Sequence, residues 1–219
     1  MMKRRINTDK YSDINSLHIF HMNGPDNLIL CDVDGVLLDW ATGFDNWMIK
    51  QGYVHRVGSE TAYLMEDRFE NITREEGRQR IREFNESTDI GNLSPLRDAV
   101  EGVAKLVSLG FNFAIISSHS DLDAACDRRE QCLKDIFGKD TFSYFVHLET
   151  GSDKDIALAS YQDADAWWIE DKTENALAGA RVGLRSILVH HDFNADDQHE
   201  ELTRVHTWND IVELITKTL

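Results

Sequence analysis

The chain has 219 residues, which at about 150 residues per domain fits one full domain with an insert. Hydrophobic residues make up 42% and charged residues 28% of the sequence, a balance that excludes a disordered chain and a fibre. The 39 acidic residues outnumber the 23 basic ones, and the net charge of -16 argues against sequence-independent binding to DNA or RNA.

Residues 1–27 are polar and weakly patterned, and we treat them as an N-terminal extension. Their basic start is followed by polar residues instead of the apolar region of an export signal. No apolar run approaches the roughly 20 residues of a membrane helix. Cys31, Cys126 and Cys132 cannot all pair and lack C-x-x-C spacing, which favours reduced thiols. We therefore expect a cytoplasmic protein without a membrane partner.

Short apolar runs predict the strands of a buried sheet, and stretches of helical character separate them. The runs are residues 28–33, 111–117, 142–146, 166–169 and 186–189. The best-defined helix signal starts at Ser94 and Pro95 and stops at Gly110. This alternation predicts an α/β fold with a mainly parallel sheet flanked by helices, which binds ligands at the carboxyl ends of its strands.

Residues 40–93 interrupt this alternation. Residues 40–50 and 73–85 predict amphipathic helices, and nothing between them resembles a core strand. We expect a helical insert over the site, with residues 28–39 and 94–219 forming the core.

Asp32 and Asp34 follow the first predicted strand. Two carboxylates so close to a buried strand repel each other, which suggests that a cation or a proton lies between them. Gly35 permits a sharp turn that aims the two side chains differently. Aspartate and glycine also form ordinary turns, so this segment alone leaves a purely structural turn open.

Three later segments carry polar residues that suit phosphate or a cation. Ser117 and Ser118 close the second strand and offer hydroxyls to a phosphate oxygen. Lys154, at the start of a predicted helix, could neutralise a phosphate and a carboxylate. Glu170 and Asp171 follow the fourth strand and are hard oxygen ligands of the kind that suits Mg²⁺. Each signal is weak alone, because serine often caps a helix and a lone lysine is usually on the surface.

The order D-x-D-G, serine, lysine and acidic pair resembles the haloacid dehalogenase-like (HAD) hydrolase superfamily over residues 30–189. The resemblance implies a Rossmann-like HAD core with a small helical cap inserted after the first strand. Phosphatases and phosphomutases of the superfamily share the second aspartate, Asp34, whereas its dehalogenases lack it.

The resemblance also implies a role for each residue. Asp32 would attack phosphorus and form an aspartyl-phosphate, while Asp34 would protonate the leaving oxygen and later deprotonate the attacking water. Ser117 would bind the transferring phosphoryl group, and Lys154 would offset its charge.

Magnesium is the cofactor that the resemblance implies. Asp32, Asp171 and the backbone carbonyl of Asp34 would hold Mg²⁺, with Glu170 acting directly or through water. The metal and Lys154 would supply the positive charge that phosphoryl transfer demands, so an acidic protein could still bind a phosphate monoester.

Within the superfamily, the 5'(3')-deoxyribonucleotidases are the closest resemblance. They share the opening of residues 32–40 and an I-D-D-K segment like residues 169–172, and they partly share residues 152–154. The second aspartate of their I-D-D-K pairs with Asp171 here, whereas Glu170 stands where they have the first.

Trp40 occupies the position at which those enzymes stack an aromatic ring on the base. Such stacking is worth about 1–3 kcal/mol per base. Trp40, Phe44 and Trp47 also share helical spacing, so Trp40 could instead pack the apolar face of the insert's own helix.

Ser118 and His119 follow Ser117, and we expect both near the mouth of the site, where they could touch substrate. The nearest cations after this segment are Arg128 and Arg129. We expect both on the exposed face of the helix that begins near residue 121.

The remaining histidines give no zinc signature. His18 and His21 are three residues apart, and His190 and His191 adjoin, but neither pair is accompanied by further ligand spacing. We expect surface or packing roles for them.

The sequence thus predicts a Mg²⁺-dependent phosphatase acting on a small phosphomonoester, with a nucleoside monophosphate favoured. A sugar-phosphate phosphatase or phosphomutase is one alternative, and a non-catalytic binding protein of the same fold is another. The expected partner is a small phosphorylated molecule, not a nucleic acid polymer or a membrane.

Overall fold

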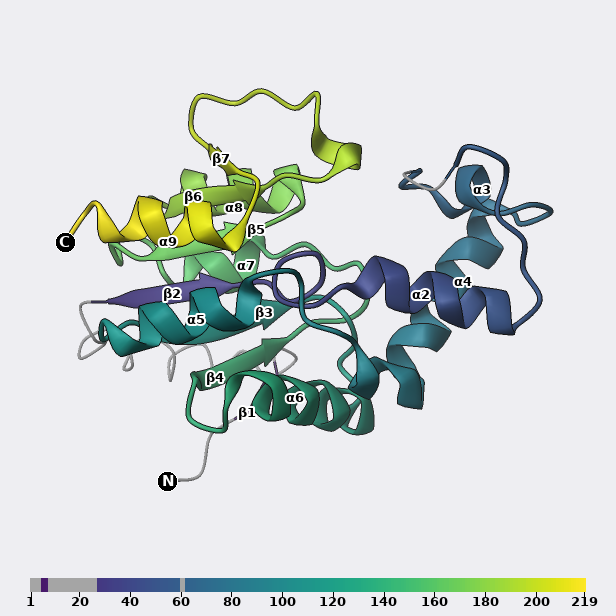
Figure 1. Ribbon diagram of the computed structural model, residues 1–219, viewed down its shortest axis with the longest axis horizontal. Coiled ribbons are helices and arrows are strands. Elements are labelled where there is room, and N and C mark those ends of the chain that lie inside the picture. Colours follow the sequence, from purple (N-terminus) through teal and green to yellow (C-terminus); the bar gives the residue numbers. More distant parts are fainter. Residues whose placement is uncertain (1–4, 8–26, 60–61) are drawn as a thin grey trace.

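The computed structural model describes residues 5–7, 27–59 and 62–219 (Figure 1). Within this part of the chain, a parallel sheet has seven strands in the order β1-β4-β3-β2-β5-β6-β7. The strands are β1 (Arg5–Asn7), β2 (Leu28–Cys31), β3 (Asn112–Ser117), β4 (Phe142–His147), β5 (Trp167–Glu170), β6 (Arg185–Val189) and β7 (Thr203–Val205). The five predicted strands are all present, and β1 and β7 were not predicted.

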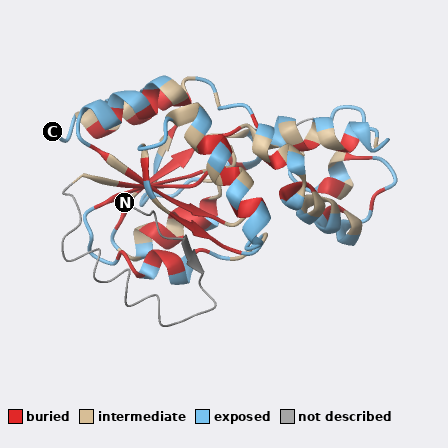
Figure 2. Cartoon of the chain, turned by 90° about the horizontal axis from the view of Figure 1, so that it is seen from below, coloured by how far each residue is buried: buried red, intermediate tan, exposed pale blue. Residues whose placement is uncertain are grey.

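Helices cover both faces of the sheet, as the alternation predicts. One face packs on α5 (Ala99–Ser108), α6 (Asp123–Phe137) and α9 (Trp208–Thr216), and the other on α7 (Asp155–Ala159) and α8 (Thr173–Arg181). Because side chains alternate along a strand, Trp167 belongs to the first core cluster and Trp168 to the second. Figure 2 shows the resulting buried strands between helices that are buried along one side only.

A helical segment, residues 40–92, projects beyond the sheet (Figure 1). It contains α2 (Trp40–Lys50), α3 (Met65–Arg68), α4 (Arg74–Glu86) and the 3-10 helix η1 (Thr88–Asn92). The two helices predicted in this segment, α2 and α4, are present. Phe44 and Phe84 are buried with their rings 5.5 Å apart, so the segment has an aromatic core of its own.

The helix predicted to start at Ser94 and Pro95 starts later, at Ala99. Pro95 instead forms an antiparallel bridge with Leu38, and the Asp39 N–H donates to the Ser94 carbonyl at 2.9 Å. This pairing joins the two connections, near residues 38 and 95, through which the chain enters and leaves the helical segment. Tertiary hydrogen bonds have therefore overridden the local capping preference.

Cys31, Cys126 and Cys132 are buried, and none of them forms a disulfide. Most of the N-terminal extension, including His18 and His21, lies outside the described residues. Among the described helices, none has the length and apolar character needed to cross a membrane.

Candidate active site

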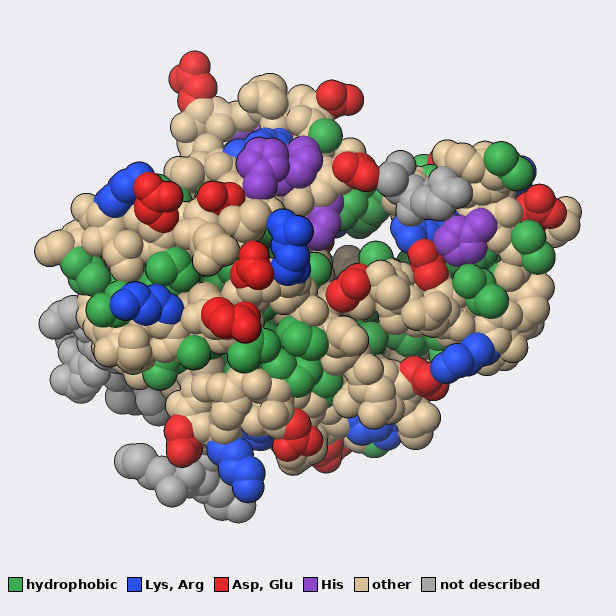
Figure 3. All heavy atoms as spheres, in the orientation of Figure 1, with side chains coloured by type: hydrophobic (Ala, Val, Ile, Leu, Met, Phe, Trp, Pro, Cys, Tyr) green, Lys and Arg blue, Asp and Glu red, His purple; other side chains and the backbone are tan. Residues whose placement is uncertain are grey.

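The carboxyl ends of the three central strands bring the predicted site residues together. Asp32 directly follows β2, Ser117 ends β3 and Glu170 ends β5. The Asp32 N–H donates to the Ile169 carbonyl at 2.9 Å, which ties the loop after β2 to β5. All three open into a cleft of about 630 Å³ between the sheet edge and the helical segment, where the surface is hollowed (Figure 3).

Lys154 is buried at the N-terminus of α7, and its ammonium group lies between two carboxylates. Its Nζ is 2.8 Å from Asp32 Oδ1 and 2.7 Å from Glu170 Oε2. Burial alone would lower the pKa of Lys154, but the two carboxylates outweigh it and raise the pKa above its usual value. Lys154 is therefore a fixed positive charge beside Asp32.

Asp32, Glu170 and Asp171 each place one carboxylate oxygen within 4.8 Å of the others. Burial first, and then the charges of neighbouring carboxylates, raise the pKa of Asp32 to about 8 and that of Asp171 to about 7. Burial likewise raises the pKa of Glu170 to about 6. The single charge of Lys154 does not neutralise three ionised carboxylates, so this oxygen donor set fits a hard divalent cation such as Mg²⁺.

Gly35 makes the turn that separates the two aspartates. Its φ is +72°, and an added Cβ would lie 2.0 Å from Asp171 Oδ2. The chain therefore reverses at Gly35 with Asp171 packed directly against its backbone. Asp32 faces Lys154, while Asp34 is directed elsewhere, as the sequence predicts.

Asp34 pairs with Arg129 of α6, and this corrects the expectation that Arg129 is exposed. Arg129 is completely buried, and its guanidinium reaches the two Asp34 carboxylate oxygens at 2.5 and 3.2 Å. Arg129 shares the buried side of α6 with Cys126 and Leu133. The helical spacing of Arg129 from Cys126 and Leu133 is the sequence signal that could have indicated this inward position. Arg128 is half-buried and donates to the Glu86 carbonyl at 2.6 Å.

Ser117 and Ser118 both line the cleft. Ser117 is buried, and the Ser118 hydroxyl is buried without a hydrogen-bond partner among the described residues. A buried hydroxyl in that state suits a phosphate oxygen as a partner.

His119 does not reach the cleft, contrary to the expectation from its position. It is 1% exposed, is absent from the cleft lining, and its ring lies 5.2 Å from that of His147. The turn after β3 directs the side chain toward α6. Only the backbone of His119 faces the helical segment, with its carbonyl accepting from Asn85 Nδ2 at 2.8 Å.

Trp40 both lines the cleft and packs within the helical segment. Its indole stacks on Phe44 with centroids 4.8 Å apart and contacts the Phe84 ring edge-on. The indole N–H donates to Asn85 Oδ1 at 2.8 Å. Trp40 is therefore fixed in place, and both of its expected roles are compatible with this geometry.

Three arginines of the helical segment also line the cleft, and the sequence analysis missed them: Arg68, Arg74 and Arg78. Arg68 forms an ion pair with Asp45, and Arg74 lies 3.8 Å from Glu66. Arg78 has no ion pair with any residue in the described part of the chain. These cations line the same cleft as the carboxylates of Asp32, Glu170 and Asp171.

His191 also lines the cleft, although the sequence analysis expected it at the surface or in packing and did not include it among the site residues. Its Nε2 lies 2.7 Å from the Gly35 carbonyl oxygen and 4.0 Å from Asp171 Oδ2. His191 thus supports the turn that carries the two aspartates.

No family model and no curated protein matches the sequence. Solved structures do match it. A haloacid dehalogenase-like hydrolase from Streptococcus pneumoniae has a TM-score of 0.59 at 15% identity, over 86% of this chain and 98% of that one. A predicted phosphatase from Clostridium acetobutylicum has a TM-score of 0.62 at 18% identity, over 87% and 98%. A putative β-phosphoglucomutase from Thermotoga maritima has a TM-score of 0.55 at 16% identity, over 88% and 100%.

At these identities the matches establish the fold. The chain has the α/β fold of HAD-like hydrolases, and the predicted fold class is confirmed.

Proposed function

We propose that the protein is a Mg²⁺-dependent phosphatase that hydrolyses a small phosphomonoester through an aspartyl-phosphate on Asp32. One observation carries the proposal: Asp32 touches Lys154 and lies with Glu170 and Asp171 in a cluster of carboxylates that could hold a metal ion, at the base of a cleft. A nucleophile, a fixed positive charge and a hard-metal donor set are what phosphoryl transfer needs.

The metal would be held by Asp32, Asp171 and the backbone carbonyl of Asp34, and when bound it would neutralise charge on the phosphoryl oxygens. Glu170 is already engaged at both oxygens. Its Oε2 accepts from Lys154, and its Oε1 accepts from the backbone N–H of Asp171 and Lys172. This supports an indirect role for Glu170, through water and through Lys154.

The protein side chains divide the remaining work. An Asp32 oxygen attacks phosphorus while the bond to the leaving oxygen breaks, and Asp34 gives that oxygen its proton. Ser117, Ser118 and Lys154 hold the phosphoryl oxygens. Water then attacks the phosphorus of the aspartyl-phosphate while the bond between phosphorus and the Asp32 oxygen breaks. Asp34 takes the water proton, and inorganic phosphate leaves.

Asp34 needs one free oxygen for this role. Its Oδ1 is held by Arg129 at 2.5 Å, whereas the contact of its Oδ2 is longer, at 3.2 Å. The Asp34 side chain is 25% exposed and lines the cleft. We infer that Oδ2 exchanges Arg129 for the substrate oxygen while Oδ1 stays bound.

We further propose that residues 40–93 form a cap that selects substrate over a core of residues 28–39 and 94–219. A nucleoside monophosphate remains the favoured substrate, because Trp40 lies in the cleft between this cap and the core. The absence of a disulfide among Cys31, Cys126 and Cys132 fits a reducing, cytoplasmic compartment.

A second candidate is a phosphatase or phosphomutase for sugar phosphates with a further anionic group. The observation that favours it is the set of three cap arginines, since guanidinium groups bind phosphate and carboxylate well.

The test is phosphate release from a panel of nucleoside 5'- and 3'-monophosphates, sugar phosphates and sugar bisphosphates, with Mg²⁺ or EDTA. We expect metal-dependent release that Asp32→Asn abolishes. Asp153→Asn is the matched control, because Asp153 is exposed and close in sequence to Lys154. Release that survives Asp32→Asn would refute the mechanism, and transfer to an added sugar phosphate would favour the mutase. No release from any compound would favour the binding protein.

A further inference from the structure

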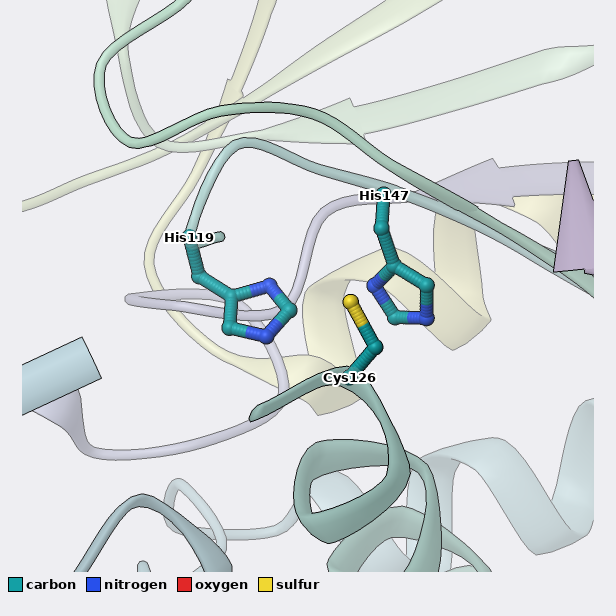
Figure 4. Close-up of side chains that lie close together, drawn as sticks. All are labelled: His119, Cys126 and His147. Atoms are coloured by element: carbon teal, nitrogen blue, oxygen red, sulfur yellow. The ribbon is translucent and has the colours of Figure 1, made fainter. Parts of the chain in front are cut away.

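Behind the cleft, three potential metal ligands from separate elements meet in the interior. His119 lies in the turn after β3, Cys126 in the first turns of α6, and His147 at the end of β4. They are 1%, 1% and 4% exposed. One donor atom of each lies within 4.8 Å of the other two, and Figure 4 shows the side chains converging with the sulfur between the two rings.

The chemistry of this cluster differs from that of the acidic cluster in the cleft. Two imidazoles and a thiolate suit Zn²⁺ and related transition metals, whereas Mg²⁺ prefers oxygen. Tetrahedral Zn²⁺, with ligands at about 2.0–2.3 Å, places donor atoms about 3.5 Å apart. Small side-chain rotations would bring the three donor atoms to that spacing.

The surroundings orient one of the histidines as a ligand. His147 Nε2 lies 3.2 Å from Glu130 Oε1, and Glu130 is one turn beyond Cys126 on α6. A carboxylate on one ring nitrogen fixes the tautomer that presents the other nitrogen to a metal. That other nitrogen of His147 lies on the side of Cys126 (Figure 4).

We propose that His119, Cys126 and His147 bind a transition-metal ion of the Zn²⁺ type, at a site separate from the Mg²⁺ site. On binding, Cys126 gives up its thiol proton and the metal takes its place on sulfur. A water or one further donor completes the four ligands. The ion would crosslink the turn after β3, the end of β4 and α6.

This position gives the ion a structural role next to the active site. Ser117 and Ser118 precede His119 directly, and Arg129 is one turn beyond Cys126 on α6. The metal would therefore hold the phosphate-binding turn and the Asp34 partner in one fixed arrangement. The site has no sequence signature because its ligands come from three elements.

The test uses the full chain produced in medium with Co²⁺, followed by removal of loosely held ions with EDTA. We expect about one retained Co²⁺ per chain and a thiolate-to-Co²⁺ charge-transfer absorption in the near ultraviolet. Cys126→Ser should abolish this absorption. Cys132→Ser is the matched control, because Cys132 is also buried on α6 and its Sγ also contacts a backbone carbonyl, yet it does not belong to the histidine cluster.

Cys31→Ser is a second control, because Cys31 adjoins Asp32 at the Mg²⁺ site and should leave the absorption unchanged. X-ray absorption at the cobalt edge of the wild-type protein should show one sulfur and two imidazole neighbours, and it needs no variant that could misfold. Absence of sulfur around the metal, or an absorption that survives Cys126→Ser, overturns the proposal. Absence of retained metal leaves the cluster as packing and overturns it equally.

Discussion

The guanidinium of the fully buried Arg129 donates hydrogen bonds to both carboxylate oxygens of Asp34. Asp34 itself reaches the cleft, so the pair joins a buried cation on α6 to the proposed acid and base of the reaction. Breaking such a pair on one side leaves the other charge buried and uncompensated.

We predict that Asp34→Ala both inactivates the enzyme and lowers the free energy of unfolding. The free energy of unfolding should fall by about 3 kcal/mol. This is the low end of the range for breaking a buried ion pair, because Asp34 is partly exposed. Asp34→Ala combined with Arg129→Met should recover much of that stability and none of the activity. Denaturant unfolding and phosphate release measure the two effects. Purely additive losses of stability would contradict the pairing, and Arg128→Met is the matched control.

Gly35→Ala should abolish Mg²⁺-dependent activity. The added Cβ would collide with the Asp171 carboxylate, 2.0 Å away, and would also strain the positive φ of the turn. Gly52→Ala is the control for strain alone, because Gly52 has a φ of +90° and nothing within 4 Å of its added Cβ. We expect Gly52→Ala to cost about 1–2 kcal/mol of stability and to leave the Mg²⁺ affinity unchanged. Equal effects of the two variants on Mg²⁺ affinity would contradict the close packing of Asp171 against Gly35.

The stability of the metal-free protein should fall as pH rises from about 4 to about 8. In this window the folded protein binds more protons than the unfolded chain, because Asp32 has a folded pKa of about 8 against 3.8, and Asp171 about 7 against 3.8. Glu170 acts in the same direction, with a pKa of about 6 against 4.5.

Mg²⁺ should reverse this trend, because it binds the deprotonated carboxylates. Thermal unfolding across this pH range, with EDTA or with Mg²⁺, measures both effects. Asp171→Asn should flatten the metal-free slope and reduce the stabilisation by Mg²⁺. A metal-free protein whose stability rises through the same window would show that the three carboxyls are not proton-bound in the fold.

A substitution of Trp40 would distinguish nucleoside monophosphates from sugar phosphates as substrates. If it stacks on a base, Trp40→Leu should raise KM for nucleoside monophosphates by about 5- to 150-fold, the equivalent of 1–3 kcal/mol. Trp40→Phe should raise it less, because a ring remains. Ribose 5-phosphate, which lacks a base, should be unaffected by either change. An equal loss with both substrates would assign Trp40 to packing of the helical segment.

A substitution of Arg78 tests the second candidate function, a phosphatase or phosphomutase for sugar phosphates with a further anionic group. Arg78→Ala should raise KM for a sugar bisphosphate about tenfold, because it removes a charge-assisted contact to the second phosphate. KM for ribose 5-phosphate should not change. Arg82 is exposed on the same helix and does not line the cleft, so Arg82→Ala is the control. An unchanged KM for the bisphosphate in Arg78→Ala would remove Arg78 from the binding site.

The sequence was sufficient to predict that Asp32, Ser117 and Glu170 lie together at one edge of the sheet. Asp32, Ser117 and Glu170 each end or follow a buried apolar run, and parallel strands bring such ends to one edge. Lys154 was predicted from its place at the start of a predicted helix and from the order of the motifs. The structure places its ammonium group between Asp32 and Glu170.

Two incorrect predictions, the helix start at Ser94 and the exposure of Arg129, depend on contacts between distant segments. The bridge of Pro95 with Leu38 displaced the predicted helix start. The acceptor for Arg129 lies on another element, so local polarity indicated a surface position. His119 was placed by closeness in sequence to Ser117, although a single turn redirects its side chain.

The position of β2 between β3 and β5 determines when the site can exist during synthesis. The chain carries the proposed nucleophile, Asp32, near the beginning, but the proposed metal ligand Asp171 emerges from the ribosome much later. Because β5 must pair with β2 before these carboxylates meet, a partly made chain holds an unreactive aspartate. The proposed phosphatase activity would therefore appear only once most of the protein has been made, and it would be lost early if β5 detached from β2.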